Sequence, residues 1–298
     1  MKIILHKIFK KINTLTYTLY QKYLKKYVKL SSKPFITGDT FRSQSNHILD
    51  DTCSIDHRKI KEGDIIFIKT DYLNEFFELH VSALPNKLVL VTHNSDTNIK
   101  ENPFGSKLSE KSIHWFAQNL EIDITLEPFI HPLPIGFENR NWIKNGKLSV
   151  LRNVQIKDNK KNKIFCAFNT STNKERIEIL HHLDFNNNVE YFRRTGHKKY
   201  MDTLSEYKVS VCPPGNGIDT HRIWESLLVG TLPIVKKSPF TKNLFSLGVP
   251  LVLINSWNEL ESINENFITD VYSNNLTKLR EQRFTENLFW MDKIKNVF

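Results

Sequence analysis

The sequence predicts an α/β protein made of two domains, each built on a parallel sheet. Its 298 residues are about twice the length of a typical domain of roughly 150 residues. Hydrophobic residues make up 40% and charged residues 25% of the chain, the composition of a globular protein. After Pro34, short β-branched runs alternate with polar helical stretches, which is typical of βαβ units. The hydrophobic content excludes a disordered chain, and because no apolar run approaches eighteen residues, we expect no integral membrane protein.

The first 32 residues form a basic segment. Residues 1–30 contain eight lysines and no acidic residue, against a net charge of +10 for the chain. Apolar residues recur there at helical spacing, at Ile8, Ile12, Leu15, Leu19, Tyr23 and Tyr27. This pattern predicts an amphipathic helix on an anionic membrane surface. The alternative is that this helix packs on the body of the protein. Nucleic acid is the less favoured partner, because no basic cluster elsewhere in the sequence extends the lysines into a surface long enough for a duplex.

Residues 33–145 predict the first domain. Buried strands are expected over 64–69 and 88–92, with a helix between them over 72–82. A second helix is expected over 109–119, followed by a strand over 122–126 and a short edge piece over 133–136. A polar break over 139–163 then includes Asn145-Gly146, and residues 146–163 of it are predicted to link the domains.

Residues 164–274 repeat the alternation of strand and helix. Strands are expected over 164–168, 189–192, 208–212, 232–235 and 251–254. Helices are expected over 174–182, 198–206 and 220–229, and residues 275–298 are expected to add one long terminal helix, over 277–295. Two Rossmann-like βα domains with a closing C-terminal helix form the GT-B architecture of many glycosyltransferases, in which substrates bind in the cleft between the domains.

The most informative stretch follows Cys212. Pro213-Pro214 ends a strand, and a glycine-containing loop then leads into a helix whose first-turn amides can bind an anion such as a diphosphate. Arg222 and Glu225 lie three residues apart on that helix, so they face the same side. A guanidinium can bind phosphate oxygens, and a carboxylate can accept from the two ribose hydroxyls. The candidate donor-binding residues here are Pro214, Gly215, Asn216, Gly217, Asp219, Arg222 and Glu225.

This stretch resembles the exostosin-type glycosyltransferases (glycosyltransferase family 47) of bacterial type. The matching residues are Cys212, Pro213, Gly215, Arg222, Glu225, Gly230 and Pro233. Looser likenesses cover residues 34–42, 91–96, 113–119 and 133–140, so the resemblance spans about residues 34–254. It implies a nucleotide-sugar donor and transfer with inversion. Because similar patterns occur in fucosyltransferases, an enzyme with a GDP-sugar donor is the alternative, and a non-catalytic basic membrane- or nucleic-acid-binding protein is the other.

Polar residues after the strands of the first domain are candidates for the acceptor side. Ligands of open parallel sheets bind beyond the carboxyl ends of the strands. Sugar transfer needs a base that takes the proton of the attacking hydroxyl, and a carboxylate or imidazole can do so. The candidates are Asp39, Asp71, His93 and Asp96; helix capping or turn formation is the alternative role of each.

A hydroxyl-rich turn follows the first expected strand of the donor domain. Thr170, Ser171 and Arg176 are candidates there for binding phosphates. Capping of the next helix is an equal explanation for the turn. No Asp-x-Asp triplet occurs, so we expect no metal or other cofactor and a cation role for arginine. Three cysteines without a C-x-x-C pair are typical of a reducing compartment. Together these observations predict a cytoplasmic glycosyltransferase, peripheral to the inner membrane, acting on a surface polysaccharide or lipid-linked glycan.

Overall fold

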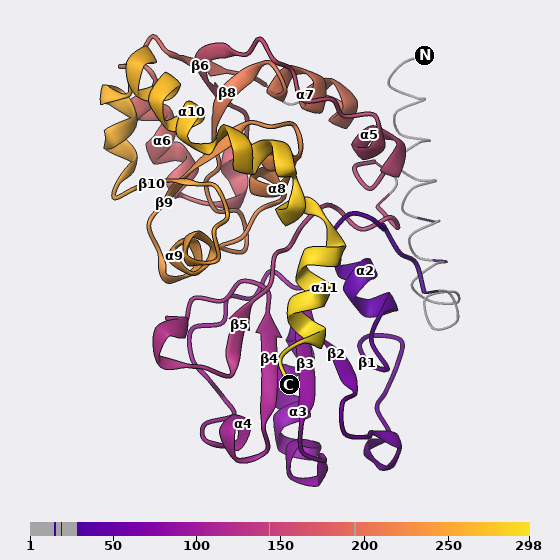
Figure 1. The fold of residues 1–298 in the computed structure, drawn as a ribbon. Helices are drawn as coiled ribbons and strands as arrows, with labels where there is room; N and C mark the ends of the chain where they lie inside the picture. The colour runs from indigo at the N-terminus through magenta and orange to yellow at the C-terminus, as the bar shows by residue number, and fades with distance from the viewer. Residues whose placement is uncertain (1–14, 16–18, 20–28, 143, 194) are drawn as a thin grey trace.

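The computed structural model describes residues 15, 19, 29–142, 144–193 and 195–298, and Figure 1 gives the order of the elements. Each half of the chain contains a five-stranded parallel sheet. The predicted α/β class with two βα domains, each built on a parallel sheet, is confirmed. The predicted membrane-binding segment lies outside the described residues, except for residues 15, 19, 29 and 30. Among the described helices, none has both the length and the apolar character needed to span a bilayer.

The first sheet has the order β1-β2-β3-β4-β5, so its strands follow one another in chain order. Its third strand is buried along its whole length, as a parallel strand covered on both faces should be. The elements of this half are α2 (Gly38–Ser43), β1 (His47–Leu49), η2 (His57–Lys59), β2 (Ile65–Lys69), η3 (Thr70–Tyr72), α3 (Leu73–Leu79), η4 (Val81–Ala83), β3 (Leu88–His93), α4 (Lys107–Glu110), β4 (Ile113–Ala117), η5 (Ile124–Leu126) and β5 (Ile130–Pro132).

The second sheet has the order β10-β9-β8-β6-β7. Its elements are α5 (Leu148–Arg152), β6 (Lys161–Cys166), η6 (Thr170–Thr172), α6 (Glu175–Leu183), β7 (Val189–Tyr191), α7 (His197–Leu204), β8 (Tyr207–Val211), α8 (His221–Leu228), β9 (Leu232–Lys236), α9 (Pro239–Ser246), β10 (Val252–Ile254), η7 (Trp257–Ser262), α10 (Glu265–Glu281), η8 (Arg283–Thr285) and α11 (Asn287–Lys295).

Three expectations about individual elements were wrong. The helix expected over 109–119 is helical only at its first two residues, in α4, and its middle is strand β4, whose pairing with β3 aligns Leu90 with Trp115. The strand expected over 122–126 is the single turn η5, and the fifth strand comes later, at β5. The single terminal helix is two helices, because Gln282 has a left-handed backbone (φ 52°) that ends α10. The stretch predicted as a linker contains α5 and the start of β6.

The second break redirects the chain from one domain to the other. Figure 1 shows α10 on the second domain and α11 lying beside α2 on the first. The backbone N–H of Asn287 donates to the carbonyl of Pro34 (2.6 Å), and that of Ile36 donates to the carbonyl of Thr285 (3.3 Å). The C-terminal residue Phe298 packs edge-on against His114 of β4. The last helix is therefore part of the first domain's surface.

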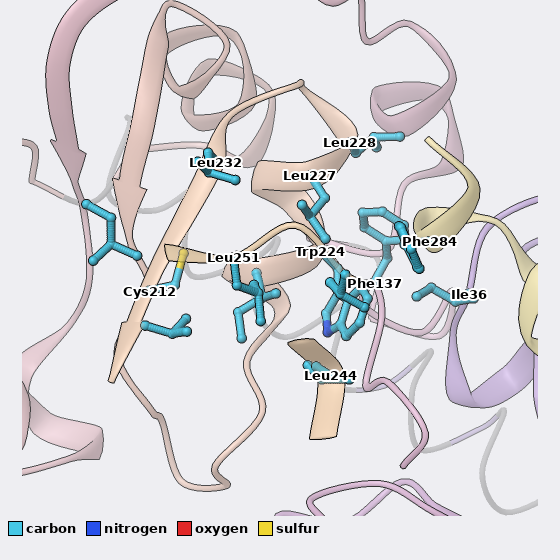
Figure 2. Close-up of a cluster of buried hydrophobic side chains, with 14 of the residues drawn as sticks. Ile36, Phe137, Cys212, Trp224, Leu227, Leu228, Leu232, Leu244, Leu251 and Phe284 are labelled. Carbon is cyan, nitrogen blue, oxygen red and sulfur yellow. The ribbon is translucent and has the colours of Figure 1, made fainter. Parts of the chain in front are cut away.

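One buried cluster extends across the junction between the domains. Figure 2 shows Ile36 and Phe137 of the first domain beside Trp224 of α8 and Phe284 of η8. All four side chains are almost inaccessible to solvent. Burial of this apolar surface favours the contact between the two domains.

Candidate functional site

The second sheet has a topological switch point at its centre. The chain leaves β6, forms β7 on one side and then crosses to β8 on the other side. In open α/β sheets ligands bind at such a point, beyond the carboxyl ends of the strands. The loop after Val211, which carries the predicted donor motif, ends there beside the turn that follows Cys166. The local fold thus brings the motif to the expected binding position.

Arg222, in the first turn of α8, presents a guanidinium at this switch point. Its Nε donates to the carbonyl of Ala167, directly after β6, at 2.8 Å. Among the residues that the structure describes, this is the only hydrogen bond recorded for the side chain, which is half-buried. The terminal nitrogens of a fixed, planar fork therefore remain available for the oxygens of a phosphate.

Glu225, one turn further along α8, is held by a residue that the sequence analysis missed. His197 begins α7, and its Nε2 lies 3.0 Å from Oε1 of Glu225. Burial raises the pKa of Glu225, but the hydrogen bond from His197 and the charges of His197, His221 and Arg222 together keep the pKa below its ordinary value, so the carboxylate remains ionised. Its side chain is 13% exposed, which leaves it open to a ligand.

The guanidinium of Arg176, which we expected to bind phosphate, is instead surrounded by protein oxygens. Its Nε donates to the carbonyl of Pro214 (2.8 Å), while Nη1 donates to the carbonyl of Asn169 (2.9 Å) and to Oγ1 of Thr172 (2.6 Å). Burial lowers its pKa to about 10. This guanidinium connects two loops of the donor side, so its hydrogen bonds are used within the protein.

Thr170 and Ser171 lie in η6, at the carboxyl end of β6. The Ser171 side chain is exposed and that of Thr170 is half-buried. The turn is capped by Asn169, whose Oδ1 accepts from the backbone N–H of Ser171 at 3.1 Å. The capping role is therefore taken by Asn169, and both hydroxyls remain candidates for the donor site.

The glycine-containing loop of the motif is docked against the first domain. Nδ2 of Asn216 donates to Oδ2 of Asp96 (3.0 Å), and the backbone N–H of Ile218 donates to Asn98 (2.8 Å). A Cβ atom on Gly217 would lie 2.6 Å from Nδ2 of Asn119, so any larger residue would force the Asn119 side chain to move. We expected these glycines to let the backbone approach a ligand. At Gly217 the backbone instead approaches Asn119 of the first domain, and at Gly215 it approaches Arg176.

Asp219 also serves the junction between the domains. Its Oδ2 accepts from the backbone N–H of Ile135 (2.6 Å), and both oxygens accept from the indole N–H of Trp224 (3.0 and 3.1 Å). Burial raises the pKa of Asp219 to about 7, against the effect of these donors. Since both oxygens have protein donors, Asp219 is not among the donor ligands that we propose below.

The four acceptor-side candidates line one cavity of about 680 Å³ on the first domain. Other lining residues include Asp51, Lys69, Glu138, Trp142 and His221. His221 belongs to α8 of the second domain, so this cavity opens beside the helix that carries Arg222 and Glu225. Strand ends of one domain and the start of a helix of the other thus meet at a single cavity.

The cavity's candidates differ in the partners that they have. Asp39 is buried in the first turn of α2, and its N–H donates to Asn139 (2.9 Å). Burial raises the pKa of Asp71, but hydrogen bonds from Ser95 (2.5 Å) and from Lys69 keep that pKa below its ordinary value.

Asp96 is exposed and contacts Asn216. His93 has both ring nitrogens engaged, Nδ1 by the N–H of Asn94 (2.7 Å) and Nε2 by the carbonyl of Pro134 (3.0 Å), and burial lowers its pKa to about 4. Both ring nitrogens of His93 are thus occupied, so neither is free to take a proton from a substrate.

Sequence reasoning also missed His221. Its Nδ1 donates to the carbonyl of Gly136 (2.7 Å), which fixes the ring and leaves Nε2 3.8 Å from Oε2 of Glu138. Burial lowers the pKa of His221, but the charge of Glu138 and the Gly136 carbonyl raise it above its ordinary value. An imidazole whose tautomer is fixed in this way suits proton transfer. Among the described residues, no group of three or more His, Cys, Asp or Glu is arranged as a metal site.

Comparisons with known proteins show only weak similarities. No family model matches the sequence. Human ribitol-5-phosphate xylosyltransferase 1 is 28% identical over 82 residues, which cover 23% of this chain and only 18% of that protein's length. Among solved structures, the E. coli trehalose-6-phosphate structure bound with UDP-2-fluoro glucose aligns with a TM-score of 0.45 and 11% identity, covering 81% of this chain and 75% of that one.

The pneumococcal O-GlcNAc transferase GtfA in complex with UDP and GlcNAc aligns with a TM-score of 0.38 and 12% identity, covering 80% of this chain and 58% of that one. An alpha,alpha-trehalose-phosphate synthase (UDP-forming) from Burkholderia vietnamiensis aligns with a TM-score of 0.42 and 9% identity, covering 82% and 80%. These values indicate a distant likeness.

Proposed function

We propose that the protein is a glycosyltransferase that moves a sugar from a nucleotide-sugar donor to a hydroxyl of an acceptor glycan. One observation carries the proposal: the polar cavity of the first domain opens beside the helix of the second domain that bears Arg222 and Glu225 at the switch point. Transfer needs an acceptor hydroxyl and an activated sugar next to each other, and this junction offers a binding surface for each.

On the donor side, the diphosphate would lie against Arg222 and the first turn of α8, and the ribose hydroxyls would donate to Glu225. Thr170 and Ser171 border this position. As the bond between the sugar and the diphosphate breaks, negative charge develops on the departing phosphate. The guanidinium and the helix amides are fixed in place to stabilise that charge, with no reorganisation at the moment of reaction.

On the acceptor side, a base in the cavity would take the proton of the hydroxyl as its oxygen attacks the anomeric carbon. Of the four candidates from the sequence, Asp39, Asp71 and Asp96 are kept and His93 is set aside because both its ring nitrogens are occupied. His221 joins them because its Nε2 lies at the junction. Inversion of the anomeric centre, membership of the exostosin type and the absence of a metal requirement remain parts of the proposal.

The biological setting belongs to the proposal as well. The basic residues 1–30 support a protein that acts at an anionic membrane surface, on a lipid-linked or polysaccharide acceptor in the cytoplasm. The human relative is named as a xylosyltransferase, so a xylose-bearing nucleotide sugar belongs among the donors tested, beside hexose donors.

The test is calorimetric titration of the protein with UDP and with GDP, followed by an assay for nucleotide release from a panel of nucleotide sugars. Replacing Arg222 by Met should weaken binding by about 2 to 4 kcal/mol, roughly 30- to 1,000-fold, because a charged hydrogen-bond partner is lost. Arg280→Met, which removes an exposed pair with Asp158, is the matched control and should change nothing.

Unchanged affinity in Arg222→Met would contradict the donor site, and failure of the wild-type protein to bind either nucleotide would contradict the function. Tighter binding of GDP than of UDP would favour the fucosyltransferase-like alternative. Nucleotide binding without release from any nucleotide sugar would favour a non-catalytic protein. Loss of activity in EDTA, restored by a divalent ion, would contradict metal independence.

A further inference from the structure

We propose that His197 is a positioning residue of the donor site, which holds the Glu225 carboxylate so that it distinguishes a ribonucleotide from a deoxyribonucleotide. The inference rests on the proposed function and extends it to a residue outside the donor motif. His197 lies 28 residues before Glu225, at the start of a different helix.

The contact between these residues is buried on both sides. Nε2 of His197 lies 3.0 Å from Oε1 of Glu225, with side chains 8% and 13% exposed. A carboxylate accepts hydrogen bonds only, so the ring must donate from Nε2. A carboxylate removed from water to this extent needs such a partner. The hydrogen bond therefore fixes the orientation of the Glu225 carboxylate and keeps it ionised, so that it can accept hydrogen bonds.

The remaining capacity of Glu225 matches a ribose. A carboxylate has about four acceptor positions on its two oxygens. His197 takes one. About three positions remain, enough for the donors on the 2′ and 3′ hydroxyls of one ribose. A 2′-deoxyribose would leave one of these positions unpaired in a partly dry site, which costs binding energy.

A second observation points to a ligand beside His197. Its Nδ1 is buried and, among the described residues, has no hydrogen-bond partner. Buried polar atoms are rarely left in that state, and those that are tend to acquire a partner from water or from a ligand. A second His–Glu pair in the same domain provides a contrast: His182 and Glu261, 2.7 Å apart, have side chains that are 21% and 40% exposed.

The experiment compares three ligands on four proteins. The ligands are the ribonucleoside diphosphate that binds more tightly of UDP and GDP, its 2′-deoxy analogue, and inorganic pyrophosphate. The proteins are the wild type, His197→Phe, His197→Gln, whose amide can still donate, and the control His182→Phe. Calorimetric titration gives the affinities, and thermal melting shows whether each variant is folded.

In the wild type the ribonucleotide should bind about tenfold more tightly than its deoxy analogue. His197→Phe should abolish most of that difference and leave pyrophosphate affinity unchanged, His197→Gln should retain it, and His182→Phe should equal the wild type. In a Glu225→Gln background, His197→Phe should have no further effect on the ribose preference, because His197 acts through Glu225.

A His197→Phe protein that keeps the full ribose preference would overturn the inference. So would equal losses for nucleotide and pyrophosphate, or a Gln variant as impaired as the Phe variant. If His197→Phe does not fold, the Gln variant and the Glu225→Gln comparison decide. These results differ from failure of the proposed function, in which the wild-type protein binds neither UDP nor GDP.

Discussion

Gly217→Ala is expected to weaken the junction between the domains. The added methyl carbon would lie 2.6 Å from Nδ2 and 2.9 Å from Oδ1 of Asn119, so the Asn119 side chain must move away. Asn119 makes two hydrogen bonds there: its Oδ1 accepts from the N–H of Asp219 (3.0 Å), and its Nδ2 donates to the carbonyl of Ser95 (3.1 Å). Both would be lost or lengthened.

The size of the effect follows from these two bonds. A typical hydrogen bond contributes about 0.5–1.5 kcal/mol to stability, so two contribute about 1–3 kcal/mol. Alanine lowers the conformational entropy of the unfolded chain relative to glycine, which raises the free energy of unfolding by about 0.4–1 kcal/mol. The difference of the two ranges is about 0–2.6 kcal/mol, so we expect the free energy of unfolding to fall by about 1.3 kcal/mol, the middle of that range. The two domains share one buried cluster, so the loss should appear in their common unfolding transition.

Urea unfolding followed by circular dichroism measures this change. Gly196→Ala is the matched control, since a Cβ there meets no atom within 4 Å and the backbone has φ −68°. Asn119→Gly gives the decisive comparison, because the side chain that clashes is absent and glycine accepts the positive φ of 55° at that position. If Gly217→Ala costs as much in the Asn119→Gly background as in the wild type, the proposed clash is refuted.

Three further predictions concern other parts of the molecule. Because burial raises the pKa of Asp219 from about 3.8 to about 7, the folded chain binds this proton more tightly than the unfolded chain, so stability should fall as pH rises between these values; Asp219→Asn should remove that slope from the urea midpoint, and an unaltered slope would contradict it. Lys160→Met should lower the free energy of unfolding by about 1–3 kcal/mol, because the carbonyls of Ser205 and Val229 lose the ammonium group that donates to them at 2.6 and 2.9 Å. A loss below about 0.5 kcal/mol in the same urea assay would contradict this and show that water replaces the ammonium group. Removing residues 1–30 should abolish salt-sensitive sedimentation with anionic vesicles yet preserve nucleotide binding; continued sedimentation would contradict the membrane assignment.

The sequence was sufficient for elements whose local pattern and final surroundings agree. The run that forms β8, the Pro/Gly loop after it and α8 were predicted within a few residues. Strand β4 was missed because its residues are buried on both faces, so the alternation that identifies a half-exposed strand is absent. The break after α10 depends on one left-handed residue, Gln282, in a stretch whose helical pattern continues on both sides.

The site was predictable where function depends on one short stretch and not where it depends on pairing across the fold. Arg222 and Glu225 share a helix, so their spacing alone predicts a common direction. The partner of Glu225 begins another helix, and the role of Asp219 depends on Ile135 of the other domain. Periodicity carries no signal for such contacts. A histidine within a basic turn and a histidine directly before Arg222 were the available hints.

The return of the chain to its first domain has a mechanical consequence. Two covalent connections cross between the domains, one before β6 and one at Gln282. Two fixed points define a rotation axis, so a relative movement of the domains would be a hinge about the line through them. To let a donor enter and a nucleotide leave, such a rotation would have to break hydrogen bonds of the 216–221 loop and the bond from Asn243 to the carbonyl of Ile122, and would shear the shared apolar cluster.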